Sequence, residues 1–175
     1  MTLALNDYVL KATAKALKNN KHILVSLDGD QIIKRAHVNI GMAVALEDGL
    51  IVPVIKDADK MSLGEISEAA RDLAERARTN KLSMDEYKGS TFSISNLGMF
   101  GVETFNPIIN QPDAGILGVC AVQDELVMDD AGAITKRQFM RISFTFDHRL
   151  IDGATAAKFE LAIRDLMEHP MQILL

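Results

Sequence analysis

The sequence predicts an α/β sandwich, in which helices cover one face of a sheet. Three observations predict this class. Short stretches rich in β-branched and aromatic residues outnumber the helical stretches. Several of them follow one another across turn residues, as hairpin strands do. Two or three amphipathic helices remain to cover one sheet face, and 175 residues suffice for one domain with a substantial core.

Composition and charge exclude several classes of protein. Apolar residues make up 48% of the chain and charged residues 25%, as in soluble globular proteins. A net charge of −5 without a basic tract gives no reason to expect nucleic acid binding. We find no apolar run of membrane-spanning length and no signal peptide, and the four histidines are too scattered for a metal site. The single cysteine, Cys120, cannot form an internal disulfide, which agrees with a reducing cytoplasm or organelle matrix. Because it lies in an apolar stretch, we expect it to be a core residue.

The first third of the chain predicts one helix followed by strands joined through tight turns. We expect the helix over residues 5–18, with Asn6 or Asp7 as its cap. The expected strands are residues 22–27, 32–34, 38–47 and 50–55. Asp48-Gly49 marks the hairpin turn between the last two, and Pro53 fits an edge or a bulge.

The clearest helix signal comes next. Ser62-Leu-Gly-Glu65 is a capping box, in which the serine and glutamate side chains bond to free backbone N–H groups at a helix start. Apolar residues then recur at three- and four-residue spacing, with charged residues between them. We therefore expect an amphipathic helix with a solvated charged face, followed by a polar connector with a helical turn at residues 84–87.

The second half of the chain predicts the remaining strands and a final helix. The expected strands are residues 90–95, 114–122, 125–128 and 134–141, the last leading into 142–146. Residues 103–112 show no regular pattern, whereas 154–168 have helical spacing and an apolar tail, 171–175, follows. Gly98 and Gly101 do not fit a phosphate-binding loop, and we expect them to let the backbone turn sharply near a ligand.

One stretch carries most of the chemistry. Residues 142–146 are β-branched, aromatic or small, which indicates a buried strand, and Asp147, His148 and Arg149 follow directly. A partly buried imidazole keeps a free lone pair near neutral pH and can act as a base. A lone histidine more often only satisfies polar groups at a strand end, but the H-x-x-x-D-G spacing to Asp152 favours catalysis. Asp147 and Arg149 fit a surface ion pair.

Two blocks of the sequence resemble those of one enzyme family. Asp147-His-Arg-Leu-Ile-Asp-Gly153 resembles the D-H-R-x-x-D-G motif of dihydrolipoamide acyltransferases, the E2 components of 2-oxo acid dehydrogenase complexes such as pyruvate dehydrogenase. Thr91-Phe-Ser-Ile-Ser-Asn-Leu-Gly-Met-Phe-Gly101 resembles that family's other signature. The similarity runs from about Leu5 to Leu175. It implies the two-layer α/β fold of the chloramphenicol acetyltransferase type.

The resemblance implies transfer of an acyl group, with acetyl preferred, between dihydrolipoamide and coenzyme A. His148 matches the histidine that takes the proton from the coenzyme A thiol. Ser95 matches the hydroxyl that donates a hydrogen bond to the oxyanion. Asp152 matches an acid that supports the active-site backbone through a buried ion pair with an arginine; by itself, its position predicts a helix N-cap. Coenzyme A is then a substrate, and the lipoyl group is carried on a separate domain.

The resemblance also implies assembly. In the family, three chains form a trimer with each active site between two of them, and trimers associate into cages through C-terminal residues. The apolar tail over residues 171–175, with no helix of its own to bury it, fits such an interface. The alternative is that the tail folds back on its own domain. The expected partners are the lipoyl domain and the other subunits of the complex.

The sequence departs from the family at its start. The family's catalytic domain opens with a helix and a long strand before the segment that resembles residues 5–18, and neither is found here. We therefore expect residues 1–175 to be an acyltransferase domain incomplete at its N-terminus, without the arginine partner of Asp152 and without lipoyl or subunit-binding domains. Alternatives are a non-catalytic structural core, against which His148 argues, and a branched-chain or succinyl-specific E2 chain. A chloramphenicol-type antibiotic acetyltransferase would lack the Asn39-Ile-Gly41 and Ser95–Gly101 blocks.

Overall fold

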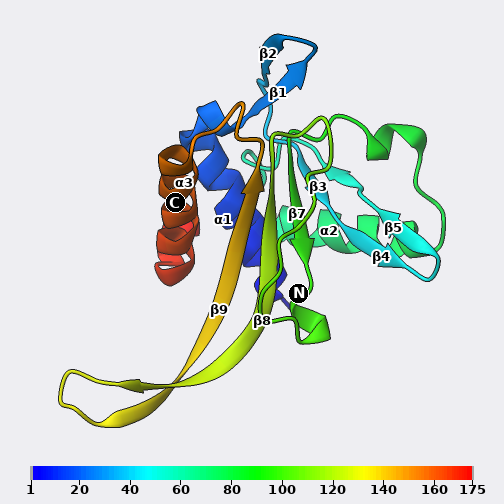
Figure 1. Ribbon diagram of the computed structural model, residues 1–175. Helices are drawn as coiled ribbons and strands as arrows, with labels where there is room; N and C mark the ends of the chain where they lie inside the picture. Colours follow the sequence, from blue (N-terminus) through cyan, green and yellow to red (C-terminus); the bar gives the residue numbers. More distant parts are fainter. Residues whose placement is uncertain (1, 175) are drawn as a thin grey trace.

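The computed structural model describes residues 2–174. Its helices are α1 (Leu5–Asn19), α2 (Leu63–Arg78), α3 (Gly153–Glu168) and α4 (Met171–Leu174), with 3-10 turns η1 (Lys21–Ile23), η2 (Met84–Tyr87) and η3 (Gly98–Phe100). Its strands are β1 (Val25–Asp28), β2 (Gln31–Lys34), β3 (Ile40–Met42), β4 (Val44–Leu46), β5 (Gly49–Ile51), β6 (Val54–Ile55), β7 (Phe92–Asn96), β8 (Gly115–Met128) and β9 (Ile134–Phe146). Over these residues the main sheet has the order β6-β3-β7-β8-β9, and α1 and α3 lie over one of its faces (Figure 1). The predicted α/β sandwich is confirmed.

The two faces of the sheet differ in what covers them. On the helix face, the Phe92 and Phe144 rings meet the ring of Phe159 on α3, with centroid distances of 5.5 and 5.3 Å. On the opposite face, the segment 102–113 crosses the sheet, and residues 103–112 are irregular, as predicted. A Cβ at Gly118 would lie 3.0 Å from Pro107 Cδ in that segment. Glycine therefore lets the segment lie directly on the sheet.

The capping box of α2 is confirmed, but the predicted cap of α1 is wrong. The Glu65 amide donates to Ser62 Oγ at 3.2 Å, and the Ser62 amide donates to Glu65 Oε2 at 2.7 Å. Helix α1 instead has Ala4 as its N-cap, and the Ala4 amide donates to Asp7 Oδ2 at 2.9 Å. Asp7 thus acts from the first turn, and neither Asn6 nor Asp7 occupies the cap position. The same carboxylate oxygen accepts a hydrogen bond from Ser67 Oγ at 2.8 Å, which joins α1 to α2.

Three predicted strands have different bounds in the structure. The strand expected over residues 38–47 splits at Ala43: the Ala43 amide still donates to Ile94 O of β7 at 2.9 Å, and from Val44 the chain pairs with β5 in a separate hairpin. The strand expected over 50–55 splits at Pro53, which has no N–H for the ladder. The first expected strand begins only at Val25, after a 3-10 turn.

Strands β8 and β9 form a long antiparallel ribbon that corrects two further predictions. The expected break between residues 122 and 125 does not exist, since β8 is continuous and only its register shifts between Val119 and Val122. Among the described residues β9 pairs with β8 alone, so it is an edge strand, and its residues 142–146 are half-buried and not the buried strand expected from their composition. Sheet order depends on contacts between distant segments, which local composition does not report.

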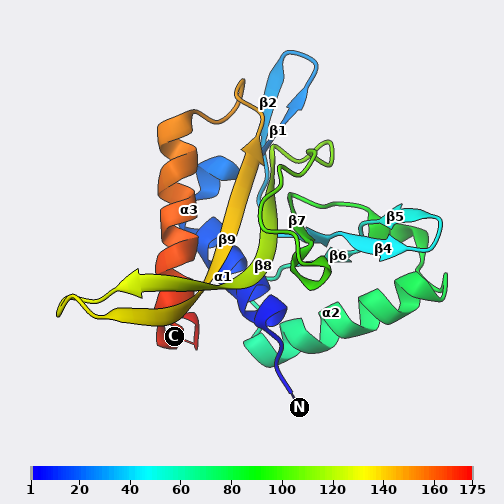
Figure 2. The same cartoon turned by 60° about the horizontal axis from the view of Figure 1, so that its bottom comes forward.

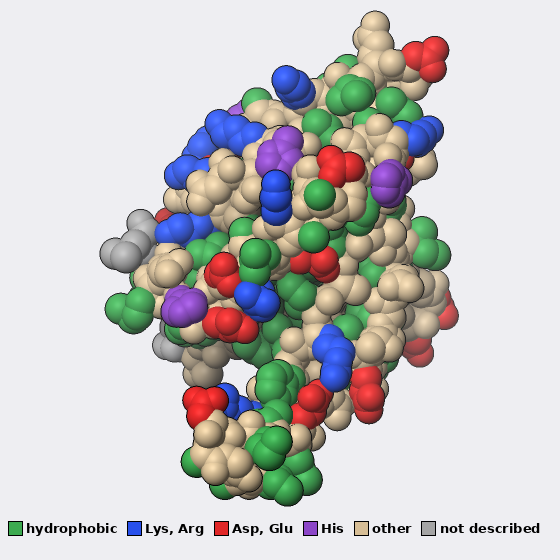
Figure 3. Space-filling view, turned by 60° about the vertical axis from the view of Figure 1, so that its left-hand side comes forward, with side chains coloured by type: hydrophobic (Ala, Val, Ile, Leu, Met, Phe, Trp, Pro, Cys, Tyr) green, Lys and Arg blue, Asp and Glu red, His purple; other side chains and the backbone are tan. Residues whose placement is uncertain are grey.

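The outer part of this ribbon, residues 122–140, projects away from the body, and we call it the arm (Figures 1 and 2). Hydrophobic side chains gather on the arm where it forms the lobe at the bottom of Figure 3. They include Leu126, Met128 and Ile134, whose side chains are 74–75% exposed.

The C-terminal residues differ from the expected tail without a helix. Residues Met171–Leu174 form α4, and Ile173 is 2% exposed because it packs into the core. Met171 and Leu174 remain 70% and 62% exposed, and Leu175 lies outside the described residues. Cys120 is buried as predicted. None of the helices within residues 2–174 has the length and apolar character needed to cross a membrane.

Candidate functional site

Ser95 lies near the carboxyl end of β7, where it pairs with Gly118 of the parallel strand β8. The side chain is half-buried and lines a cavity of about 570 Å³. Its hydroxyl group forms no hydrogen bond with any other residue in the range 2–174. The hydroxyl is therefore free to donate to a group that enters the cavity.

The cavity lies between α2, the start of α1, the β4–β5 hairpin and the turn after β7. Most of the side chains that line it are apolar, among them Met42, Val44 and Ile94. Arg71 and Arg78 of α2 also line the cavity, and within the described chain neither forms an ion pair with a carboxylate. A hydrogen bond inside such a mostly apolar space is stronger than one in water.

The turn that follows Ser95 is held by its own side chains and by β8. Asn96 Oδ1 accepts from the Gly98 amide and Asn96 Nδ2 donates to Asn6 Oδ1, both at 2.9 Å. A Cβ at Gly98 would lie 2.7 Å from the carbonyl oxygen of Cys120, and Gly101 has a φ of +76°. The prediction that these glycines serve a sharp turn is confirmed. This bracing fixes the backbone of the turn that directly follows Ser95.

His148 lies at the other end of the sheet, directly after β9. The turn begins where the Asp147 amide donates to Ala114 O at 2.8 Å, and the Ile151 amide then donates to Asp147 O at 3.0 Å. The His148 ring is exposed, not partly buried as predicted, and its centroid lies 5.7 Å from that of Phe146. Because the turn follows an edge strand, the imidazole is accessible, and another molecule can contact it.

The charged neighbours of His148 act on the turn. Arg149 Nη2 lies 2.6 Å from Asp147 Oδ2 and Arg149 Nε lies 2.9 Å from Asp147 Oδ1. This hydrogen-bonded pair lowers the pKa of Asp147. The expected surface ion pair is confirmed, and it engages the two side chains that flank the histidine in sequence.

Asp152 is the N-cap of α3, as its position predicted. Its Oδ1 accepts from the Thr155 amide and its Oδ2 accepts from Thr155 Oγ1, both at 2.9 Å. These hydrogen bonds, the backbone one first, lower the pKa of Asp152. The carboxylate is exposed, and no lysine or arginine in residues 2–174 pairs with it. The buried ion pair implied by the family resemblance is not formed within this part of the chain.

A single chain does not bring Ser95 and His148 together. Ser95 pairs with Gly118, Gly118 pairs with Ser143, and His148 follows Ser143 by five positions. The extended residues from Ser143 to Phe146 span about 10 Å along β9 before the turn begins, and two strand spacings add about 10 Å across the sheet. Because β9 is antiparallel to β7 and β8, the carboxyl end of β7 and the carboxyl end of β9 lie at opposite ends of the sheet, measured along the strands (Figure 1). The two side chains are thus separated by about 14 Å or more.

The sequence matches the profile of the 2-oxoacid dehydrogenases acyltransferase (catalytic domain) family over residues 2–175. This chain belongs to that family. It is 43% identical over 173 residues to the dihydrolipoyllysine-residue succinyltransferase component of the 2-oxoglutarate dehydrogenase complex of Rickettsia typhi, covering 99% of this chain and 43% of the relative. It is also 43% identical over 175 residues to the mitochondrial dihydrolipoyllysine-residue acetyltransferase component of the pyruvate dehydrogenase complex of Schizosaccharomyces pombe, covering 99% of this chain and 36% of that relative. The chain spans about two fifths of the length of these curated relatives.

Solved structures agree with the family and the fold. Dihydrolipoamide acetyltransferase of Azotobacter vinelandii superimposes with a TM-score of 0.92 at 39% identity, covering 99% of this chain and 72% of that one. The cubic core of the pyruvate dehydrogenase multienzyme complex gives 0.92 at 40% identity, again covering 99% and 72%. A chloramphenicol acetyltransferase shares the fold, with a TM-score of 0.61 at 13% identity over 94% of this chain and 78% of that one. The predicted two-layer fold of that type is confirmed.

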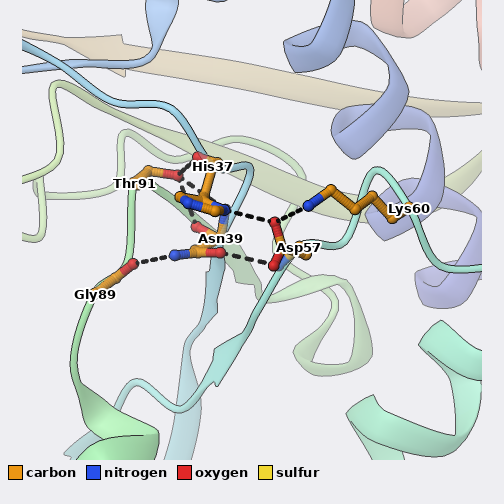
Figure 4. Close-up of polar contacts among 6 residues, drawn as sticks. All are labelled: His37, Asn39, Asp57, Lys60, Gly89 and Thr91. Carbon is orange, nitrogen blue, oxygen red and sulfur yellow. Dashed lines mark hydrogen bonds and ion pairs between the residues drawn. The ribbon is translucent and has the colours of Figure 1, made fainter.

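Sequence reasoning missed a cluster around Asp57 that stabilises the Asn39-Ile-Gly41 block (Figure 4). Asp57 Oδ1 lies 2.8 Å from His37 Nδ1 and accepts from Lys60 Nζ at 3.0 Å, and these contacts, the histidine first, lower the pKa of Asp57. Asn39 Oδ1 accepts from the Asp57 amide at 2.9 Å, while Asn39 Nδ2 donates to Gly89 O at 2.7 Å. The cluster therefore joins the start of β3 to two loops.

A second missed group is a buried acid on the face of the sheet opposite the helices. Asp113 is 4% exposed, and its Oδ2 accepts from Ser90 Oγ at 2.5 Å and Ser93 Oγ at 2.6 Å. Its Oδ1 is buried with no hydrogen-bond partner in the described chain. Burial raises the pKa of Asp113, against the effect of the two serines. No local pattern could reveal this group, because its members are separated by 20 and 23 positions.

Proposed function

We propose that residues 1–175 are the acyltransferase domain of an E2 component and transfer an acyl group between dihydrolipoamide and coenzyme A, with acetyl preferred. The observation that carries the proposal is the free Ser95 hydroxyl in a mostly apolar cavity, in a chain whose family is that of 2-oxo acid dehydrogenase acyltransferases. Such a cavity fits the uncharged thioester arm of either substrate. The lipoyl group would arrive on a separate domain of the complex, which acts in the bacterial cytoplasm or the mitochondrial matrix.

His148 is the proposed general base. A neutral imidazole accepts the proton of the coenzyme A thiol, and the thiolate then attacks the carbonyl carbon of the acyl-dihydrolipoamide thioester. When the tetrahedral intermediate collapses, the C–S bond to the lipoyl group breaks and the imidazolium returns the proton to the departing thiolate. The exposed position of His148 supports this role, because a base must reach the thiol of a substrate that enters from solvent.

Ser95 is the proposed donor to the oxyanion of that intermediate. One fixed donor in a water-poor site contributes about 3 kcal/mol to transition-state stabilisation. The bracing of the turn by Asn96 and Gly98 supports this role, because a donor held in place needs no reorganisation during the reaction. In the Azotobacter vinelandii enzyme, a serine, a histidine and an asparagine four positions beyond that histidine concern the catalytic mechanism. His148 and Asp152 have the same spacing.

Asp152 is a positioning residue in this proposal. As N-cap of α3 it fixes the end of the turn that carries His148. It would act on the imidazole through the backbone and not through contact with substrate. The non-catalytic core remains the alternative in which all three residues serve the fold alone.

The separation of Ser95 and His148 leads us to propose that each site forms between two chains of a homotrimer. One chain then supplies the histidine and its neighbour supplies the serine. That a related structure is the cubic core of a multienzyme complex supports further association of such trimers. Met171 and Leu174, which are exposed on α4, are our candidates for contacts between trimers.

A succinyl group is the second candidate, and one observation favours it. Arg71 and Arg78 line the same cavity as Ser95, and a guanidinium would pair with the free carboxylate of a succinyl group. A succinyltransferase relative and an acetyltransferase relative are equally similar to this chain, each at 43% identity. Acyl transfer to coenzyme A should be measured with acetyl-, succinyl- and isobutyryl-dihydrolipoamide. Loss of succinyl transfer alone in Arg71→Ala/Arg78→Ala would assign succinyl specificity, and no transfer with any donor would refute the enzymatic proposal.

Mixing two inactive variants tests the shared site. Chains with His148→Ala and chains with Ser95→Ala are dissociated, mixed in equal amounts and reassociated. If each site takes its histidine and serine from different chains, about one quarter of the sites in a random mixture contain both wild-type residues. Activity should therefore return to about a quarter of the wild-type level. Two active variants would argue against both residue roles, and an inactive mixture of stable oligomers against the shared site.

A further inference from the structure

The buried acid Asp113 lies next to the residue that holds the start of the His148 turn. Directly after β9 ends, the Asp147 amide donates to the carbonyl oxygen of Ala114 at 2.8 Å. Because β8 lies between β7 and β9, the segment that leads into β8 also contacts β7, and it does so through the Asp113 carboxylate. This short segment is therefore attached to β7 by a side chain and to the histidine turn by its backbone.

Two buried serines make the attachment to β7. Asp113 Oδ2 accepts from Ser90 Oγ at 2.5 Å and from Ser93 Oγ at 2.6 Å, and none of the three residues is more than 9% exposed. Ser93 Oγ also accepts from Asn110 Nδ2 at 3.2 Å, and the Asp113 amide donates to Asn110 O at 3.0 Å. We call these four residues the serine–aspartate cluster. Hydrogen bonds to a carboxylate in a dry interior are strong, so the cluster fixes this segment against β7.

The cluster has no free space in which to rearrange. A Cβ at Gly41 of β3 would lie 2.9 Å from the hydroxyl oxygens of both Ser90 and Ser93, so the backbone of β3 packs directly against them. Without the carboxylate, two buried hydroxyl groups would lose their acceptor, which costs more than the bonds contribute when they are formed. The serines and the segment that carries Ala114 would then have to shift to find other partners.

A carboxylate is not the most stable group for such a joint. Asp113 Oδ1 is buried and has no hydrogen-bond partner within residues 2–174. Apolar side chains of similar volume often replace buried charged groups without loss of stability. Unpaired polar groups in a protein interior are rare, and sites that depart from the rules of stable packing are most often functional. The acid at position 113 therefore indicates that the position of this segment matters.

The position of His148 depends on this segment. The imidazole forms no hydrogen bond with the described residues, so the backbone of the turn determines where it lies. Within the described chain, the hydrogen bonds of residues 147–151 remain inside that range, except the one from the Asp147 amide to Ala114. Ile151, which is 2% exposed, anchors the far end of the turn in the core. The near end, which carries the histidine, is joined to the neighbouring strand through Ala114.

We propose that Asp113 is a positioning residue for His148. Through Ala114 it fixes the start of the histidine turn, and the turn places the imidazole where the coenzyme A thiol arrives. The inference rests on the proposed function, since a general base must lie within hydrogen-bond reach of the proton that it accepts. A displacement of about 1 Å can lower the rate of such a step on the order of 100-fold. Asp113 does not contact the substrate and acts on the base of its own chain.

Amide hydrogen exchange tests the positioning without an assay of activity. Asp113→Ala removes the acceptor of the two serines, whereas Asp113→Asn keeps an oxygen that can accept. Leu17→Ala, at a fully buried position of α1, is the control that lowers stability elsewhere in the core. We expect the Asp147 amide to exchange on the order of tenfold faster in Asp113→Ala and near the wild-type rate in the other two variants, because this amide exchanges by local opening of the turn.

Mixed oligomers test the effect on catalysis. As in the mixture of the two inactive variants, chains with Ser95→Ala supply the histidine and chains with His148→Ala supply the serine. Adding Asp113→Ala to the Ser95→Ala chain should lower the recovered kcat roughly tenfold or more and leave the KM for coenzyme A nearly unchanged. Adding it to the His148→Ala chain should leave the recovered rate unchanged, because that chain supplies no base. Asp113→Asn on the Ser95→Ala chain should retain most of the rate.

The outcomes separate this inference from the proposed function. A loss confined to the chain that supplies the histidine supports the inference. An equal loss on either chain, or unchanged exchange of the Asp147 amide, overturns it and leaves Asp113 a structural role alone. If neither the wild-type chain nor the mixture transfers an acyl group, the proposed function fails, and the exchange rate still decides whether Asp113 holds the turn. If Asp113→Ala fails to fold, Ser93→Ala, which removes one of the two donors, is read by the same criteria.

Discussion

The two ends of the sheet hold their candidate catalytic residues in different ways. At one end Ser95 is half-buried in a cavity, and the turn behind it is fixed by Asn96, by Gly98 packed on Cys120, and by β8. At the other end His148 is exposed on a turn that is held by backbone hydrogen bonds to Asp147, by the Asp147–Arg149 pair and by the Asp152 cap of α3.

This difference indicates that the two ends of the sheet have different roles in the proposed reaction. A hydrogen-bond donor is effective only when it is fixed before the reaction, and the Ser95 end has that property within one chain. A base must meet its substrate, and the exposed His148 end becomes enclosed only when another molecule covers it. We therefore expect the serine end to be complete in the monomer and the histidine end to be completed by assembly.

The largest expected effect comes from His148→Ala. Loss of a general base should lower the rate of acyl transfer at least ~100-fold. The fold should persist because the side chain is exposed and forms no hydrogen bond with the described residues. Steady-state transfer to coenzyme A measures the effect, and His22→Ala, another exposed histidine, is the control. More than a tenth of the wild-type activity in His148→Ala would exclude this base.

Ser95→Ala tests the fixed end. Removing one oxyanion donor should lower kcat roughly 100-fold and leave the KM for coenzyme A nearly unchanged, because the hydroxyl acts in the transition state. Ser95→Thr keeps the hydroxyl and should retain more activity than Ser95→Ala. A change confined to KM would assign Ser95 to substrate binding.

Two aspartates near the His148 end should respond to pH with opposite signs. The pKa of Asp113 is raised by burial, so the folded chain binds this proton more tightly than the unfolded chain does. Its contribution to the free energy of unfolding is therefore most favourable below the ordinary aspartate pKa and is lost as pH rises through the raised value. Asp113→Asn should remove a pH-dependent component on the order of 1 kcal/mol, measured by urea unfolding from pH 4 to 8.

The pKa of Asp152 is lowered by its cap hydrogen bonds, so its contribution is present above the ordinary aspartate pKa and is lost as pH falls through the lowered value. Asp152→Asn should therefore remove a contribution to the free energy of unfolding that is present at neutral pH and is lost in acid. The same urea unfolding, compared with wild type, measures it. Equal pH dependence in the two variants would contradict the contrast between a buried and an exposed carboxylate.

The smallest expected effect is that of Asp152→Ala on the melting temperature. Loss of an N-cap should lower Tm by a few degrees, while Asp152→Asn, which can still cap, should lower it less. Acyl transfer below the melting temperature should fall less in either variant than in His148→Ala. A loss of activity as large as that of His148→Ala would give Asp152 a direct role in the chemistry.

The features predicted correctly from the sequence are those fixed by neighbouring residues. The α2 capping box needs only Ser62 and Glu65, and the cap of α3 needs only Asp152 and the turn after it. The cap of α1 was misplaced because any of several polar residues near position 6 could serve, and the structure uses Asp7 from within the helix.

Features that depend on distant contacts could not be predicted. The last contact of this segment with the main sheet is the bond from the Ala43 amide to Ile94, which lies more than fifty positions away, and from Val44 the chain pairs with β5. Polar residues at positions 123 and 124 favoured a break in the predicted strand. Strand β8 nevertheless continues through Gln123 and Asp124, since the arm projects from the body and polar side chains there remain in contact with solvent. The motifs identified Ser95 and His148 as candidates, but their separation follows from strand direction and order, which no motif contains.

The close contact of Gly98 with the backbone of Cys120 bears on how members of this family are recognised from sequence. Any side chain at position 98 would displace β8, so the glycine of the Ser-Asn-Leu-Gly pattern is required for folding whether or not the chain catalyses a reaction. A sequence search that relies on this pattern therefore selects chains that share this packing of the turn on β8, whether or not they are enzymes. Under the proposed function, the histidine of the second motif, whose exposed side chain forms no hydrogen bond with the described residues, is the better criterion for activity.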